Sequence, residues 1–184
     1  MNALGPRIRP LLGVASLALT AGILWGCGAD LPPPACPRAA IVNEAKAAAY
    51  YREGAGRDIT DVAFEVALPS LSGVCEYDFD EGRARVGSVL TISIEAKRGP
   101  ASEAESFEVP YFVAVVEPGG RILGKALFRP RLIFTESGII ARTVEEIEQI
   151  IPIGPDFVGS DYEILVGLQL DQRQLEENLK RKRR

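Results

Sequence analysis

The sequence contains no histidine among its 184 residues. This absence removes the commonest general base, the usual zinc ligand and every Ser–His or Cys–His nucleophile pair. Aromatic residues make up only 7% of the chain, and the single tryptophan is Trp25. The P-loop, GxGxxG, GxSxG and HExxH motifs are also absent. These absences favour a structural or interaction role over an enzyme. A catalytic Ser–Lys dyad or carboxylate pair stays open, because such a pair is defined by its arrangement in space and not by a sequence motif.

Charge is unevenly distributed along the chain. The formal net charge is −4, and residues 1–26 carry two arginines and no acid, so the remainder stands at −6. The last five residues are all Lys or Arg, which leaves −11 on the body between them and residue 26. Because nucleic-acid binding needs a basic surface, this acidic body argues against it. The 47% hydrophobic content is too high for a disordered chain, and the length suits one domain with additional terminal segments.

The amino terminus is typical of an export signal. Arg7 and Arg9 stand in a segment without acids, and residues 11–26 contain no charge. A cationic start followed by a short apolar stretch is the secretory signal pattern. The stretch of sixteen residues is marginal for a permanent anchor, because a spanning helix needs roughly 20 apolar residues.

The end of this stretch resembles the lipobox of bacterial lipoproteins. Leu24, Gly26 and Cys27 match the pattern, in which the cysteine is diacylated and becomes the new amino terminus, whereas small residues are usual at the position of Trp25. The resemblance implies that Cys27 carries lipid. Gly28 replaces the Asp that would retain a Gram-negative lipoprotein in the inner membrane, which favours the periplasmic side of the outer membrane. The alternatives are cleavage after Ala29 without lipid and an uncleaved anchor.

Two cysteines remain once Cys27 is assigned to lipid. An even pair in an exported chain predicts one disulfide, between Cys36 and Cys75. A redox or metal-binding pair is the alternative, but the sequence has neither a CxxC motif nor a histidine to support it. Between Cys27 and Cys36, three consecutive prolines predict a short, stiff stalk.

Most of the body alternates apolar and polar residues with a period of two, as in an antiparallel sheet with one solvated face. The clearest stretch is 84–96, and Pro118-Gly119-Gly120 predicts a hairpin turn between two others. Residues 39–51 suit either a helix or a first strand, and strand is favoured. Residues 99–106 are interpreted as a polar loop, and 144–153 as a strand with a helical turn as the alternative. Strands are expected over 60–68, 74–79, 84–96, 109–117, 121–128, 144–153 and 162–170.

The chain ends in a predicted helix. Asp171 precedes residues 172–181, and Gln174 stands at the third helical position, which together form a capping-box pattern. About seven short strands without intervening helices predict an all-β fold, an immunoglobulin- or fibronectin-like antiparallel β-sandwich with a C-terminal helix. The antibody variant, with a tryptophan against the inter-sheet disulfide, is excluded because Trp25 lies in the signal.

Three charged groups are candidate sites. Lys125, Arg129 and Arg131 are expected to form a basic stripe on one strand face, which would bind phosphates or carboxylates of an envelope partner. The alternatives are a solvated outer face and edge-strand charges that discourage aggregation. The acidic stretch 76–82 is interpreted as a hairpin turn, because no register fits an EF-hand loop, and a nonstandard calcium site is the alternative. A basic tail at the helix end complements the helix dipole and would attract an anionic surface, although a purely solvating end is the alternative. The tail comprises Lys180, Arg181, Lys182, Arg183 and Arg184.

Several segments resemble a family of uncharacterised envelope lipoproteins of alphaproteobacterial type. They are Cys36-Pro37-Arg38, 56–62, 111–115, and 167–170 followed by Gln174, Leu175 and Asn178. The resemblance implies a compartment and an architecture, without an activity, a ligand or a partner.

The sequence therefore predicts a lipid-anchored envelope protein. Its expected parts are a signal peptide (1–26), a lipidated stalk (27–35), the sandwich (36–171) and the helix with its tail (172–184). No metal or cofactor is expected. The predicted role is a structural or interaction module that docks onto another envelope protein, anionic glycolipid or peptidoglycan through a sheet edge or the basic stripe. A periplasmic domain that binds a small ligand or metal is the alternative.

Overall fold

The structure is a computed structural model that describes residues 34–54, 56–80 and 82–182, with the side chain of Lys182 left out. All of these residues belong to the second of the two units into which the chain divides, 33–184. The predicted signal peptide and the lipidated Cys27 lie outside the described residues, so both stay predictions from the sequence.

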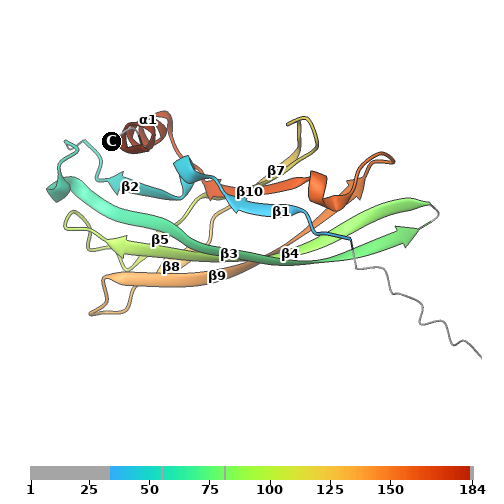
Figure 1. Ribbon diagram of the computed structural model, residues 1–184. Helices are drawn as coiled ribbons and strands as arrows, with labels where there is room; N and C mark the ends of the chain where they lie inside the picture. The colour runs from blue at the N-terminus through green and yellow to red at the C-terminus, as the bar shows by residue number, and fades with distance from the viewer. Residues whose placement is uncertain (1–33, 55, 81, 183–184) are drawn as a thin grey trace, which may run out of the picture. The chain divides into compact units, whose positions relative to one another are not determined.

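Two four-stranded sheets form the body of this unit (Figure 1). The first sheet has the order β1-β10-β6-β7, with β1 (Arg38–Ile41), β10 (Glu163–Leu168), β6 (Tyr111–Val116) and β7 (Ile122–Phe128). The second sheet has the order β2-β3-β4-β9, with β2 (Ala47–Tyr51), β3 (Val62–Asp80), β4 (Arg83–Arg98) and β9 (Ile140–Ile153). A small pair, β5 (Ser106–Glu108) and β8 (Arg131–Ile133), lies beside them. Short 3₁₀ turns cover 43–45, 59–61 and 159–161, and α1 (Gln172–Lys182) follows the last strand.

One hydrophobic cluster joins the two sheets. Leu90, Ile92 and Ile94 of β4 are at most 1% exposed, and so are Ile164, Val166 and Leu168 of β10. These are the alternate positions that the period-two pattern assigned to one face. Because burying each such side chain stabilises the fold by about 1.5–3 kcal/mol, this inner layer is the main stabilising element. The predicted all-β sandwich with a C-terminal helix is confirmed.

The strand list differs from the prediction in its details. Ten strands replace about seven, and residues 39–51 are two strands, β1 and β2, separated by a 3₁₀ turn. The predicted strands 60–68 and 74–79 are one strand, β3, because a register shift between Ala67 and Ser70 accommodates Pro69 without ending the pairing. Strand β9 begins at Ile140 rather than at residue 144, and no part of it is helical.

The connectivity departs from the expected antiparallel pattern in one pair. Strand β1 pairs parallel with β10, whereas every other pair is antiparallel among the strands that the structure describes. Immunoglobulin domains place their second and third strands in different sheets, whereas β2 and β3 pair within one sheet here. The predicted turn at Gly119 and Gly120 is confirmed, since both have positive φ and connect β6 to β7.

Candidate interaction surfaces

The predicted disulfide is present. Cys36 and Cys75 are bonded, with their Cα atoms 5.7 Å apart. Cys36 lies two residues before β1, at the edge of the first sheet, and Cys75 lies on β3 in the second sheet. The bond therefore links the two sheets at the point where the described chain begins.

The three cations of the predicted basic stripe do not share one strand face. Lys125 lies on β7, Arg131 lies on β8 in a different sheet, and Arg129 is in the connection between them. The Lys125 ammonium lies 3.1 Å from the Gln169 side-chain oxygen and 4.3 Å from the centre of the Phe112 ring. Arg131 pairs with Glu108 at 3.1 Å. Two of the three cations thus have partners within the protein.

Strand β7 is an open edge of the first sheet. It pairs with β6 on one side only, and every residue from Ile122 to Leu127 is exposed on both faces of the strand. Its aliphatic side chains are accessible, with 58% of Ile122 and 59% of Leu127 exposed. Lys125 is the only charged residue of the strand, and its ammonium lies over the Phe112 ring.

Such an edge is unusual. Native sheets protect long edges with charges, prolines or covering segments, because unpaired backbone groups otherwise pair with another strand. Sequence reasoning identified 121–128 as a strand and named a sheet edge as a type of contact. It did not identify β7 as the edge, since the strand order depends on pairings between distant segments.

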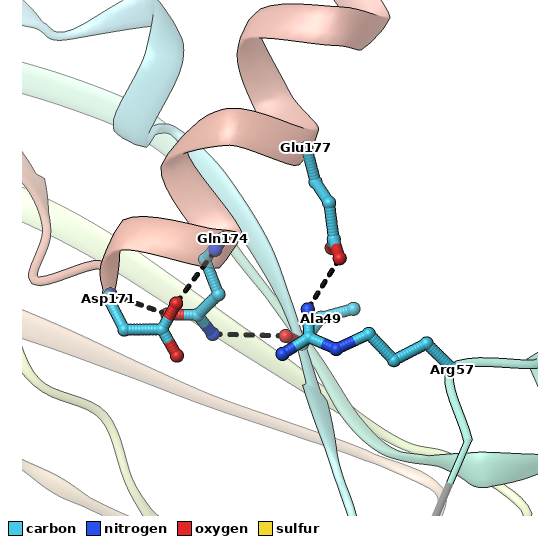
Figure 2. Close-up of polar contacts among 5 residues, drawn as sticks. All are labelled: Ala49, Arg57, Asp171, Gln174 and Glu177. Atoms are coloured by element: carbon cyan, nitrogen blue, oxygen red, sulfur yellow. Dashed lines mark hydrogen bonds and ion pairs between the residues drawn. The ribbon is translucent and has the colours of Figure 1, made fainter.

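Helix α1 is attached to the second sheet through polar side chains (Figure 2). The predicted capping box is confirmed: the Gln174 amide donates to the Asp171 carboxylate at 2.8 Å, and the Asp171 amide donates to the Gln174 side chain at 3.0 Å. The Gln174 side chain also donates to the Ala49 carbonyl of β2 at 3.0 Å. Gln174 is only 8% exposed, so its amide group is part of the packing.

The same side of α1 makes further contacts one turn later. The Asn178 side chain donates to the carbonyls of Glu44 and Ala47, at 2.8 and 2.7 Å. Glu177 pairs with Arg57, and this hydrogen bond raises the pKa of the Arg57 guanidinium above its usual value. Leu175 and Leu179 are 41% and 37% exposed. The helix thus places the side-chain amides of Gln174 and Asn178 against the second sheet and leaves Leu175 and Leu179 partly accessible.

The basic tail is described only in part. Lys180 and Arg181 are exposed in the last turn of α1, the backbone of Lys182 ends the helix, and Arg183 and Arg184 lie outside the described residues. Arg181 lines a cavity of about 400 Å³ together with Asn43, Lys46 and Asn178. The side chain of Arg181 therefore lies where the 43–45 turn and α1 meet.

The acidic stretch after Cys75 lies in a hairpin, as interpreted. Asp80 of β3 is opposite Arg83 of β4, and Asp78 pairs with Arg85 at 2.6 Å. Within the described part of the chain, no three carboxylate or cysteine groups are placed to hold a metal ion. The alternative of a nonstandard calcium site thus finds no support in the arrangement of these residues.

Comparison with known proteins identifies no relative. No family model, no curated protein and no solved structure matches the chain. Within the described residues, no helix has the length and apolar character needed to span a membrane. The resemblance to envelope lipoproteins accordingly stays a prediction from the sequence.

Proposed function

We propose that this protein is a lipid-anchored module of the bacterial cell envelope that binds another envelope protein along the edge of β7. The observation that carries the proposal is the exposure of the whole strand from Ile122 to Leu127 at a free sheet edge. The signal, the lipobox-like end at Cys27 and the Cys36–Cys75 disulfide support an exported location. The lipid would hold the domain on the periplasmic side of the outer membrane.

The edge fits an extended protein segment better than the other predicted partners. An added strand would pair with the free backbone groups of β7, and its side chains would contact Ile122 and Leu127. Anionic glycolipid and peptidoglycan require cations or many polar groups, and β7 has only Lys125. No enzymatic step is part of this proposal.

The test is site-specific photo-crosslinking in cells with the full chain. A photoreactive residue at Leu123 should form one dominant product with an envelope protein, attached within an extended segment. The same group at Val144 is the matched control, because Val144 is 60% exposed on β9, an edge strand of the other sheet. Intact-mass analysis of the purified native protein determines in parallel whether Cys27 is the acylated first residue.

A charge on the strand should abolish the contact. We expect Leu127→Lys to reduce crosslinking from position 123 at least about tenfold, equivalent to about 1.4 kcal/mol, because the added ammonium would be desolvated by the partner strand. Val144→Lys should leave the product unchanged. Equal products from positions 123 and 144, or no product from position 123, would contradict the proposed binding edge whatever the mass analysis shows.

A further inference from the structure

The described chain begins beside Cys75 and Tyr77 of β3, a few residues before the turn of the β3–β4 hairpin. The Tyr77 hydroxyl of β3 donates to the Ala35 carbonyl at 2.7 Å, and Cys36 is bonded to Cys75. Gly159, in the connection between β9 and β10, lies so close to the Tyr77 hydroxyl that a Cβ atom would clash with it. Residues 34–36, the hairpin and this connection therefore form one end of the unit, at the right of Figure 1, which we call the anchor end.

Large apolar side chains are exposed at the anchor end. Phe79 is 69% exposed, Val158 54% and Phe157 43%. Phe79 stacks on Tyr77 and continues across the sheet in one row with Ala84 of β4 and Ile153 of β9. A cavity of about 660 Å³ opens beside this row, and its apolar lining includes Ala84, Ile153, Pro155 and Phe157. Exposed aromatic groups gathered at one place indicate a contact surface.

The predicted lipid anchor limits the distance between this surface and the membrane. Seven residue steps separate Cys27 from Pro34, which at full extension span at most roughly 25 Å. If Cys27 is acylated, Pro34 is thus held within this distance of the membrane, and the anchor end begins at the residues that follow it. Ile59, beyond the opposite end of β3, is 78% exposed but twenty positions from Phe79, roughly 60 Å along an extended strand.

Charge at the anchor end argues against anionic headgroups. Six described carboxylates and three arginines lie there, and two of the arginines, Arg38 and Arg85, are paired with Glu163 and Asp78. An anionic surface would be repelled by this excess, whereas an uncharged interface would admit the aromatic rings and solvate the carboxylates. The carboxylates are those of Glu76, Asp78, Asp80, Asp156, Asp161 and Glu163, and the arginines are Arg38, Arg83 and Arg85.

We propose that the anchor end is a membrane-contact surface for a zwitterionic phospholipid leaflet, in which Phe79, Phe157 and Val158 enter the interface. This inference rests on the proposed lipid anchor, which supplies the proximity. The contact adds apolar burial to the anchor and sets the orientation of the domain, with β3 leading away from the bilayer. The basic residues of α1 take no part in it, because they lie at the other end of the sandwich (Figure 1).

Tryptophan fluorescence tests the contact. Trp25, the only tryptophan of the sequence, lies in the predicted signal peptide, so the acylated chain that begins at Cys27 has none and Phe79→Trp supplies its single tryptophan probe. The native acylated chain is reconstituted into phosphatidylcholine–phosphatidylethanolamine vesicles, with and without brominated acyl chains. We expect a blue shift and quenching by bromine at position 79 several times stronger than in the control Ile59→Trp. Both substitutions are at exposed side chains, and circular dichroism checks that the fold is retained.

The outcomes separate this inference from the proposed anchor. If the protein is acylated and vesicle-bound, and the Phe79→Trp probe is quenched no more than the Ile59→Trp probe, the membrane-contact surface is overturned and the anchor stays intact. An unacylated protein would overturn the anchor. The contact is then tested on that protein with the same vesicles, where absence of quenching at position 79 overturns it as well. Quenching that requires phosphatidylglycerol, or that added NaCl removes, would overturn the uncharged interface.

Discussion

Two tyrosines carry buried hydroxyl groups that make no hydrogen bond within the described part of the chain. They are Tyr50 and Tyr111, and Ser88 has a hydroxyl in the same situation. Tyr111 is the most deeply buried of them, with no exposed surface, and its ring stacks on Phe128. An unpaired hydroxyl loses its hydration without compensation, so the ring contributes to stability while the oxygen opposes it.

We therefore expect Tyr111→Phe to raise the free energy of unfolding by about 1 kcal/mol. The matched control is Tyr77→Phe, which removes a hydroxyl that donates to the Ala35 carbonyl and should lower stability by about 1 kcal/mol. Urea unfolding of both variants at neutral pH measures the two effects. A loss of stability in Tyr111→Phe would show that the hydroxyl is paired in solution.

The gain in the free energy of unfolding of Tyr111→Phe over the parent protein should increase at alkaline pH. Burial raises the pKa of Tyr111 to about 12, and burial likewise raises the pKa of Tyr50 to about 12. Between pH 10 and 12 the unfolded tyrosines lose their protons while the folded ones keep them, so stability falls as pH rises in this window. Each such tyrosine contributes at most about 1.4 kcal/mol per pH unit. The decline should be shallower in Tyr111→Phe, and parallel curves would contradict the raised pKa.

Among the elements, α1 differs most from an ordinary amphipathic helix. Its two leucines are partly accessible, whereas Gln174 and Asn178 bond to backbone carbonyls of the 43–51 segment. The apolar spacing of Leu175 and Leu179 would predict the opposite orientation. The carbonyls of Ala47 and Ala49 on the edge strand β2 explain the difference, because they accept hydrogen bonds from the side-chain amides of Asn178 and Gln174, which a leucine cannot donate.

A pair of alanine substitutions tests this orientation. Asn178→Ala should lower the free energy of unfolding by about 2 kcal/mol, because two hydrogen bonds are lost and the carbonyls stay partly covered. Leu179→Ala should cost less, about 1 kcal/mol, because Leu179 is 37% exposed. Both replacements improve helix propensity, so the comparison isolates the packing. A larger cost for Leu179→Ala in urea unfolding would show that the leucines pack against the sheet.

Local patterns were sufficient to predict most strands. The alternation of Leu90, Ile92 and Ile94 identified the inner face of β4, and Asp171 with Gln174 identified the start of α1. These features depend on residues within a few positions of each other. Pro69 was misread as a strand end, because its accommodation depends on a register shift against β4.

The candidate surfaces were less predictable. Lys125 and Arg131 have the spacing of one strand face, but the chain leaves β7 after Phe128 and pairs again only at β8. Pro130 between them is the signal that would have separated the two strands. The exposure of Phe79 depends on where the first sheet ends, which no local pattern contains.

At the scale of the whole molecule, different interactions stabilise the two ends of the described unit. At one end, α1 covers the edge of β2 and the 43–45 turn through side-chain hydrogen bonds. At the other, residues 34–36 are fixed to β3 by the Cys36–Cys75 bond. Strand β1 between them has only four residues and one pairing partner, β10. The attachment of β1 to the rest of the unit therefore depends on the disulfide more strongly than the attachment of any longer strand does.

Loss of the disulfide should consequently have a global and a local effect. Closing the 39-residue separation between the cysteines restricts the unfolded chain, and the chain-entropy model gives about 4 kcal/mol. In the double variant Cys36→Ser, Cys75→Ser we expect a loss of stability of this size in urea unfolding. Hydrogen exchange should show that the amides of β1 lose more protection than those of β4, since the short strand can separate from β10 while the long hairpin stays paired. Equal loss of protection in β1 and β4 would instead mean that the bond acts only on the unfolded chain, and that β1 is held by its pairing with β10 alone.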